Sequence, residues 1–115
     1  MAVYEGKRDA TGCIVTVDGR PLDPRHDLKQ FAQGFEWGYD GDGPRQLALA
    51  LLADRIGVEP ALSRYKLFLE TVVSGLDEAG WRLTGEDIDR NLGETVEVPM
   101  DLATLMRRVR DIKLK

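Results

Sequence analysis

A glycine-rich turn before the longest apolar segment has residues that could bind an anion. Gly41 and Gly43 flank Asp42, and Pro44 and Arg45 follow directly. The N-terminus of a helix carries partial positive charge and free backbone N–H groups, so it can bind a phosphate group. Against this, Asp42 repels anions, Pro44 has no N–H, and no lysine follows as in a P-loop. We interpret the turn as structural and keep a small anion or nucleotide site at Gly41, Gly43 and Arg45 as the alternative.

Other reactive side chains in this sequence have simpler roles. Glu36, Asp40 and Asp42 offer oxygen ligands that suit calcium or magnesium, but their spacing does not match an EF-hand loop. His26 lies in a polar turn without a serine or cysteine motif, and Cys13 falls in an expected strand, where a small apolar residue fits. One His and one Cys are too few for a zinc site. We therefore predict no metal, no cofactor and no enzymatic activity.

Acidic side chains dominate the segment over residues 59–100. Residues 59–100 contain nine acids and four bases, in a chain whose formal net charge is -4. A solvated helix face explains such a pattern, and so does a surface that binds a basic partner protein. The predicted partner-binding surface consists of Asp77, Glu78, Glu86, Asp87, Asp89, Glu94 and Glu97.

Residues 101–115 have the opposite charge, with five bases and two acids. Arg107, Arg108 and Arg110 form a candidate basic contact face for nucleic acid. The negative charge of the whole chain argues against a general nucleic-acid binder, because such proteins neutralise phosphates with Lys and Arg. A protein partner is therefore favoured over nucleic acid.

The N-terminal part of the chain is predicted to be extended over residues 3–22. Side chains over 13–17 alternate as in a strand, and the turns expected at 9–12 and 18–19 contain glycine, which adopts positive φ. Pro21 suggests a strand end or an edge strand. A small antiparallel meander is the expected result.

Two helices are expected after a connection over residues 23–43. The first spans 44–56 and is apolar on nearly every side, which predicts a buried central helix. The second begins at residue 59, and its apolar side chains recur at spacings of three and four. Periodicity leaves open whether this helix ends at Gly75 or at Gly80.

A third, shorter helix is expected after a link over residues 81–83. Thr84 and Asp87 form a near relative of the capping box, and apolar residues continue to Leu92. Gly93 is expected to end this helix. Beyond it, a short extended segment over 95–99 and a helix that begins at Asp101 are expected.

These elements predict an α+β fold with a small antiparallel N-terminal sheet packed against three to four helices in one domain. Residues 1–92 form the core domain, and residues 93–115 form an extension of a short strand and a helix that packs on the core. Periodicity does not distinguish packing of the last helix on its own domain from packing on a second copy, so both a monomer and a homodimer stay open.

The segment over residues 35–50 carries a resemblance to a known kind of protein. It resembles a family of small bacterial and mobile-element domains of unknown function, marked by a Trp-Gly-Tyr-x-Gly-x-Gly-Pro turn before an apolar helix. We expect Trp37 and Tyr39 of this turn to pack on the core. The resemblance extends over residues 4–92, where the matching positions are Tyr4-Glu5-Gly6, Tyr65, Phe68, Trp81 and Ile88.

The resemblance supports the fold and implies no reaction, ligand or catalytic residue. Its mobile-element setting, together with the small size and the acidity of the chain, leads to a sharper hypothesis. The chain is then a phage or mobile-element inhibitor of a host defence complex, similar to an anti-CRISPR protein. Its acidic surface covers the nucleic-acid-binding surface of that complex.

The sequence also limits where the protein is expected to work. The longest apolar run, over residues 47–53, is far shorter than the roughly 20 residues that cross a bilayer. The first residues do not resemble a secretory signal, and the single cysteine cannot form an internal disulfide. We therefore expect a cytoplasmic protein without a membrane segment.

Overall fold

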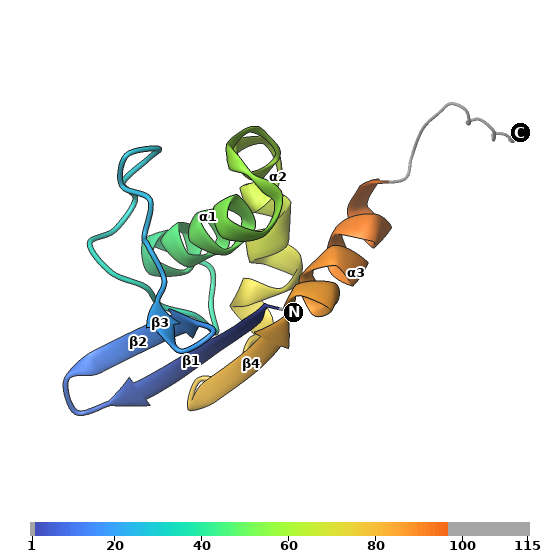
Figure 1. The fold of residues 1–115 in the computed structure, drawn as a ribbon. Coiled ribbons are helices and arrows are strands. Elements are labelled where there is room, and N and C mark those ends of the chain that lie inside the picture. The colour runs from blue at the N-terminus through green and yellow to red at the C-terminus, as the bar shows by residue number, and fades with distance from the viewer. Residues whose placement is uncertain (1, 97–115) are drawn as a thin grey trace, which may run out of the picture.

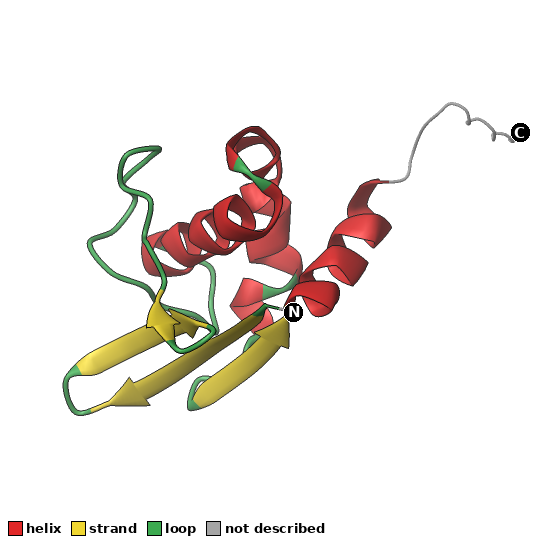
Figure 2. Cartoon of the chain, in the orientation of Figure 1, coloured by secondary structure: helices red, strands yellow, loops and turns green. Residues whose placement is uncertain are grey.

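A computed structural model describes residues 2–96 of the chain, and Figures 1 and 2 show its fold. Within these residues, the strands β1 (Val3–Asp9), β2 (Gly12–Val17), β3 (Arg20–Pro21) and β4 (Gly80–Thr84) form one antiparallel sheet in the order β3-β2-β1-β4. The helices are α1 (Asp42–Ile56), α2 (Val58–Thr71), the 3-10 turn η1 (Val73–Gly75) and α3 (Gly85–Val96). The α+β class predicted from the sequence is confirmed.

Two tight turns build the predicted meander. In the β1–β2 turn, Asp9 accepts hydrogen bonds from the backbone N–H of Thr11 at 2.8 Å and from its hydroxyl at 2.6 Å. In the β2–β3 turn, Asp18 and Gly19 have φ angles of 51° and 82°. Two successive positive φ values match the twist of a hairpin, which is why Asp-Gly is favoured there.

The link expected over residues 81–83 is wrong, because this segment belongs to strand β4. Trp81 pairs with Gly6 of β1, and Leu83 pairs with Tyr4. The indole of Trp81 lies on Gly6, where a Cβ atom would overlap the ring. Pairing between strands so far apart in the chain leaves no short-range signal, so local patterns do not reveal β4.

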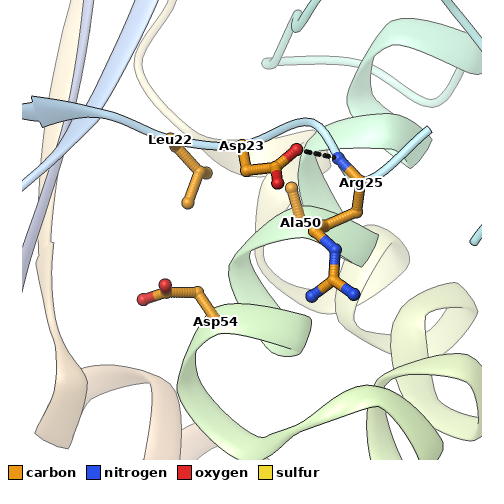
Figure 3. Close-up of a pocket in the computed structure, with 5 residues that line it drawn as sticks. All are labelled: Leu22, Asp23, Arg25, Ala50 and Asp54. Atoms are coloured by element: carbon orange, nitrogen blue, oxygen red, sulfur yellow. Dashed lines mark hydrogen bonds between the residues drawn. The ribbon is translucent and has the colours of Figure 1, made fainter. Parts of the chain in front are cut away.

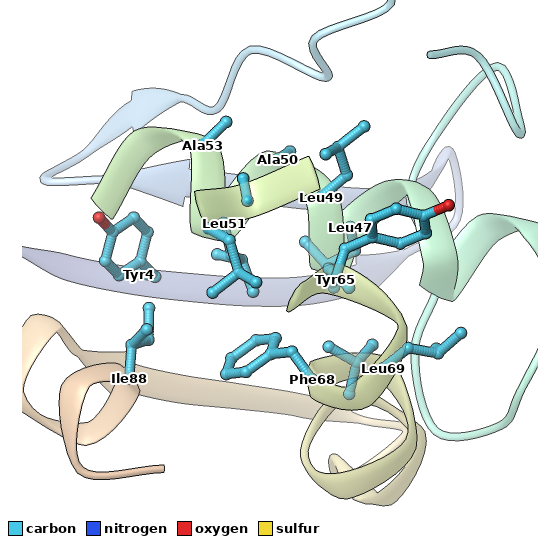
Figure 4. Packing of buried hydrophobic residues seen from close by; sticks show 14 of the residues in the cluster. Tyr4, Leu47, Leu49, Ala50, Leu51, Ala53, Tyr65, Phe68, Leu69 and Ile88 are labelled. Atoms are coloured by element: carbon cyan, nitrogen blue, oxygen red, sulfur yellow. The ribbon is translucent and has the colours of Figure 1, made fainter. Parts of the chain in front are cut away.

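Helix α1 is the buried central helix that the sequence predicts. It begins at Asp42, two residues before the predicted Pro44, and its side chains over 47–53 are buried. Gly57 ends the helix with a φ of 97°, a conformation that favours glycine. Figure 4 shows the leucine side chains of α1 among Tyr4, Phe68 and Ile88, which come from β1, α2 and α3.

Helix α2 ends earlier than the sequence predicts. The α-helix stops at Thr71, and η1 carries the chain on to Gly75, so neither Gly75 nor Gly80 ends the α-helix itself. The covered face of the sheet and the inner faces of α1 and α2 form one apolar core. In Figure 1 the helices lie on one side of the sheet.

Helix α3 begins with the predicted cap but ends later than predicted. The Asp87 N–H donates to the Thr84 hydroxyl at 3.1 Å, and the Thr84 N–H donates to the Asp87 carboxylate at 3.0 Å. This reciprocal pair is a capping box. The helix continues through Gly93 and ends at Val96. The extended segment expected over residues 95–99 is therefore wrong for residues 95 and 96. The predicted boundary between the core domain and the extension, at residue 92, falls inside α3.

The remaining sequence predictions on the C-terminal extension lie outside the described residues. These are the rest of the segment over 95–99, the helix that begins at Asp101, and the basic face of Arg107, Arg108 and Arg110. Over residues 2–96, no helix combines the length and the apolar character needed to cross a membrane.

Candidate functional site

Side chains of this protein already lie against the glycine turn at the start of α1. Gly41 caps the helix in an extended conformation without a side-chain hydrogen bond. Gly43 packs closely on Glu36, because a Cβ on this glycine would lie 2.7 Å from the Glu36 Cβ. Arg45 pairs with Asp42 at 3.1 Å. The residues of the candidate anion site therefore lie beside two carboxylates, which disfavour an anion.

The aromatic part of the same turn is a structural anchor. Trp37 is fully buried, and its indole N–H donates to the Glu78 carbonyl at 3.1 Å. Its ring meets Trp81 edge-on, with centroids 5.6 Å apart. The Arg8 guanidinium lies 4.9 Å from the Trp37 ring centroid and donates to the same carbonyl at 2.8 Å. The expected packing of Trp37 on the core is confirmed, but Tyr39 is 49% exposed and is not part of the core, so its predicted packing there is wrong.

Gln46 is a key residue that sequence reasoning missed. It is fully buried, and its amide nitrogen donates to the carbonyls of Pro24 at 2.6 Å and Lys29 at 3.0 Å. Its amide oxygen accepts the N–H groups of Phe31 at 2.7 Å and Ala32 at 3.1 Å. One side chain thus ties the long β3–α1 loop to the central helix. The signal in the sequence is a lone amide directly before the apolar run over residues 47–53.

The predicted acidic surface is divided between the two ends of β4. Asp77 and Glu78 precede β4, whereas Glu86, Asp87 and Asp89 follow it in the first turns of α3. Opposite ends of a five-residue strand are about 13 Å apart. Glu94 lies further along α3, and Glu97 lies outside the described residues.

Two of these acids already have partners within the domain. The Thr84 N–H and the Arg90 guanidinium hold the pKa of Asp87 below its usual value. Asp89 forms two hydrogen bonds with Arg55, at 2.6 and 3.1 Å, and this pairing also lowers the pKa of Asp89. Both carboxylates stabilise the start of α3 as well as contributing negative charge to the surface.

Further carboxylates gather at the end of the sheet where β1 begins. Asp18, in the β2–β3 turn, accepts the Val3 N–H at 2.9 Å. Asp54, in the last turns of α1, accepts the hydroxyl of the buried Tyr4 at 2.7 Å. Burial and the neighbouring Asp54 raise the pKa of Tyr4, so the phenol stays neutral and keeps donating its proton.

Two arginines lie among these carboxylates, and one of them, Arg55, connects them with the start of α3. Arg25 pairs with Asp27 at 3.1 Å, and Arg55 pairs with Asp89. Arg25 also interacts electrostatically with Asp23 and Asp54, as Arg55 does with Glu86 and Tyr4. We call this region the acidic end face, and it comprises Asp18, Asp23, Asp27, Asp54, Glu86 and Asp89.

A cavity of about 140 Å³ opens within the acidic end face, between the β3–α1 loop and helix α1. As Figure 3 shows, Leu22, Asp23 and Arg25 come from the loop, whereas Ala50 and Asp54 come from the helix. Asp23 accepts the Arg25 N–H at 2.8 Å. This bond supports Arg25 in a left-handed conformation, with a φ of 59°.

Neither Cys13 nor His26 belongs to a reactive cluster. Burial raises the pKa of the Cys13 thiol, and the nearby Glu36 carboxylate raises it further, so the reactive thiolate is disfavoured. One ring nitrogen of His26 lies 3.0 Å from the Ala32 carbonyl. Over residues 2–96, no three His, Cys, Asp or Glu side chains are grouped so that they could hold a metal ion.

The comparisons with known proteins agree with the coarser part of the resemblance, that of a domain of unknown function. No curated protein and no solved structure matches the chain. A family of unknown function, DUF6166, matches residues 4–94, which include strands β2 to β4, all of β1 except Val3, and α3 except its last two residues. This match covers well over half of the sequence, and the chain therefore belongs to the DUF6166 family.

Proposed function

We propose that this chain is a non-enzymatic interaction domain that binds a basic surface of a partner protein through its acidic end face. The observation that supports this proposal is the convergence of six carboxylates from four separate segments. These segments are the β2–β3 turn, the β3–α1 loop, the end of α1 and the start of α3. The sequence alone predicted a binding surface over residues 77–97. The proposal keeps an acidic binding surface but locates it at the acidic end face.

Physical chemistry explains why such a face suits protein recognition. Complementary charges raise the rate at which two proteins meet, and they disfavour partners of the wrong sign. Hydrogen bonds to Val3, Tyr4 and Arg55 hold three of the carboxylates in place before a partner arrives. Ordering a side chain on binding costs about 0.5–1.5 kcal/mol, so carboxylates that are already held lose less on association.

The experiment is an affinity capture from bacterial lysate at low and moderate salt, followed by mass spectrometry. A partner that binds through the acidic end face should be lost as salt rises, because salt screens exposed charges. The variant D27K/E86K reverses two charges on the face and should abolish capture. The matched control E59K/E70K makes the same charge change on exposed positions of α2 and should retain the partner.

The outcome that contradicts the proposal is equally specific. If D27K/E86K and E59K/E70K retain the same partner to the same extent, the acidic end face does not bind it. Circular dichroism of each variant must first show an unchanged helix content. This check separates a lost interface from a lost fold.

A narrower form of the proposal concerns the partner. The family resemblance, the size and the acidity favour an inhibitor that covers the nucleic-acid-binding surface of a host defence complex. Carboxylates on a rigid face compete with phosphates for the same Lys and Arg side chains. The test is competition: duplex DNA should displace the chain from its captured partner, and an inhibitor of this kind should protect phage from the defence system. If duplex DNA does not displace the chain from its partner, the inhibitor hypothesis is excluded, but binding through the acidic end face is not.

A further inference from the structure

We propose that the cavity in the acidic end face binds the ammonium group of a lysine side chain from the partner protein. This inference rests on the proposed function and adds a defined contact to it. The cavity is lined by Leu22, Asp23, Arg25, Ala50 and Asp54. Its occupant follows from three properties: the size of the cavity, the chemistry of its lining, and the hydrogen-bonding capacity of its two carboxylates.

The size of the cavity suits one side chain rather than a cofactor. Its volume is about 140 Å³, whereas pockets for drug-sized molecules have about 300–1,000 Å³. A protein cavity of roughly 150 Å³ holds a single benzene molecule. Space of this size therefore accepts the end of one long side chain.

The lining is apolar on one part and acidic on another. Leu22 and Ala50 are buried and form the apolar part, which suits the methylene groups of a lysine stem. Asp23 and Asp54 are exposed at the edge and supply negative charge. The charge of Arg25 is already matched by Asp27, which accepts hydrogen bonds from its Nε and one terminal nitrogen. The cavity therefore keeps a net attraction for a cation.

The hydrogen bonds at the two carboxylates favour ammonium over guanidinium. One oxygen of Asp23 accepts the Arg25 N–H, and one oxygen of Asp54 accepts the Tyr4 hydroxyl. In the described part of the chain, no donor contacts the second oxygen of either carboxylate. A guanidinium fork prefers both oxygens of a single carboxylate, whereas an ammonium group can direct its three donors to separate acceptors. The oxygen of each carboxylate that has no donor is its more open acceptor, which suits single contacts from an ammonium group.

The experiment titrates the full chain with three tripeptides and follows backbone amide shifts by NMR. The probes are the acetylated, amidated peptides Gly-Lys-Gly, Gly-Arg-Gly and Gly-norleucine-Gly. The lysine peptide should give saturable shifts confined to residues 22–25 and 50–54. The norleucine peptide has the same stem without the charge and should give none, and the arginine peptide should bind more weakly. Equal shifts with lysine and norleucine, or tighter binding of arginine, would overturn the inference.

Two isosteric variants test the carboxylate directly. Asp54→Asn keeps an acceptor for the Tyr4 hydroxyl and removes the charge, so lysine-peptide affinity should fall about tenfold. Glu70→Gln removes the same charge from an exposed position of α2, outside the acidic end face, and should alter affinity less than about twofold. Equal effects of both variants would indicate general charge attraction and would overturn the inference. Partner capture that fails with D27K/E86K but persists with Asp54→Asn leaves the proposed function intact and rejects the lysine pocket alone.

Discussion

Gln46 shows how much of the architecture depends on one side chain. Its amide uses two donors and two acceptor positions, and all four bond to the backbone of the loop that follows β3. That loop also supplies Asp23 and Arg25 to the cavity. A buried amide with every hydrogen bond satisfied fixes a single conformation, because any other position would leave polar groups unpaired.

Gln46→Met should destabilise the domain by about 3 kcal/mol, since the substitution leaves two N–H groups and two carbonyls without their partner. Urea unfolding followed by circular dichroism measures this change. Gln33→Met, on an exposed position of the same loop, is the matched control and should change stability by less than about 0.5 kcal/mol. Equal stability of the two variants would show that Gln46 does not anchor the loop.

At the scale of elements, the pairing of β1 with β4 is the contact that adds the last strand to the sheet. It joins segments separated by more than seventy residues, and it places the Trp81 indole on Gly6. Trp81 in turn meets Trp37, so the conspicuous Trp-Gly-Tyr turn packs against β4. The turn therefore has a structural role that depends on a strand at the other end of the domain.

Gly6→Ala should destabilise the domain by about 2 kcal/mol or more, because the new methyl group overlaps the Trp81 ring. Thermal unfolding is a suitable measurement. Gly34→Ala is the control, since an added Cβ there meets no atom within 4 Å and the backbone φ is not positive. An unchanged melting temperature for Gly6→Ala would contradict the packing of Trp81 on β1.

The start of α3 should make stability depend on pH. Hydrogen bonds from Thr84 and Arg90 lower the pKa of Asp87 in the folded chain, and Arg55 lowers the pKa of Asp89. A carboxyl group whose pKa is lower in the folded chain stabilises the fold at pH values above its pKa in the unfolded chain, which is near 3.9. This contribution disappears as the pH falls through the pKa of the folded chain. The stability gap between the natural chain and D87N/D89N should therefore shrink from about pH 5 to pH 2.5 in urea titrations. A gap that is independent of pH would contradict these pKa shifts.

At the scale of the whole molecule, negative charge is distributed over separate regions rather than over one continuous patch. Asp77 and Glu78 lie near Arg8 and Trp37, whereas the acidic end face lies at the opposite end of β4. The two regions are about 13 Å apart along β4, a distance that an interface of standard size can span, so each region needs its own charge-reversal variant. The proposed function assigns binding to the acidic end face.

The variant D77K/E78K should accordingly retain the partner that D27K/E86K loses. Both variants change the net charge equally, so the comparison isolates the position of the charge from its amount. Capture efficiency at fixed salt is the measurement. Loss of the partner in D77K/E78K alone would move the binding surface back to the region before β4.

Several features of the fold could be predicted because they depend on neighbours in the chain. Asp18-Gly19 adopts the two positive φ values of a tight hairpin, Gly57 ends α1, and Thr84 with Asp87 forms a capping box. The apolar run over 47–53 predicts a buried helix because no polar stripe is available to face water. Each of these inferences uses interactions within a few residues, which a pattern in the sequence can report.

Only the tertiary structure decided the features that join distant segments. Strand β4 exists because Trp81 and Leu83 pair with β1, the role of Gln46 requires the loop to fold back on α1, and the cavity needs Asp23 and Asp54 on facing elements. The sequence alone determined the acidity, the buried helix and the local turns of this protein. The folded chain decided which carboxylates meet, because long-range proximity depends on packing and not on spacing along the chain.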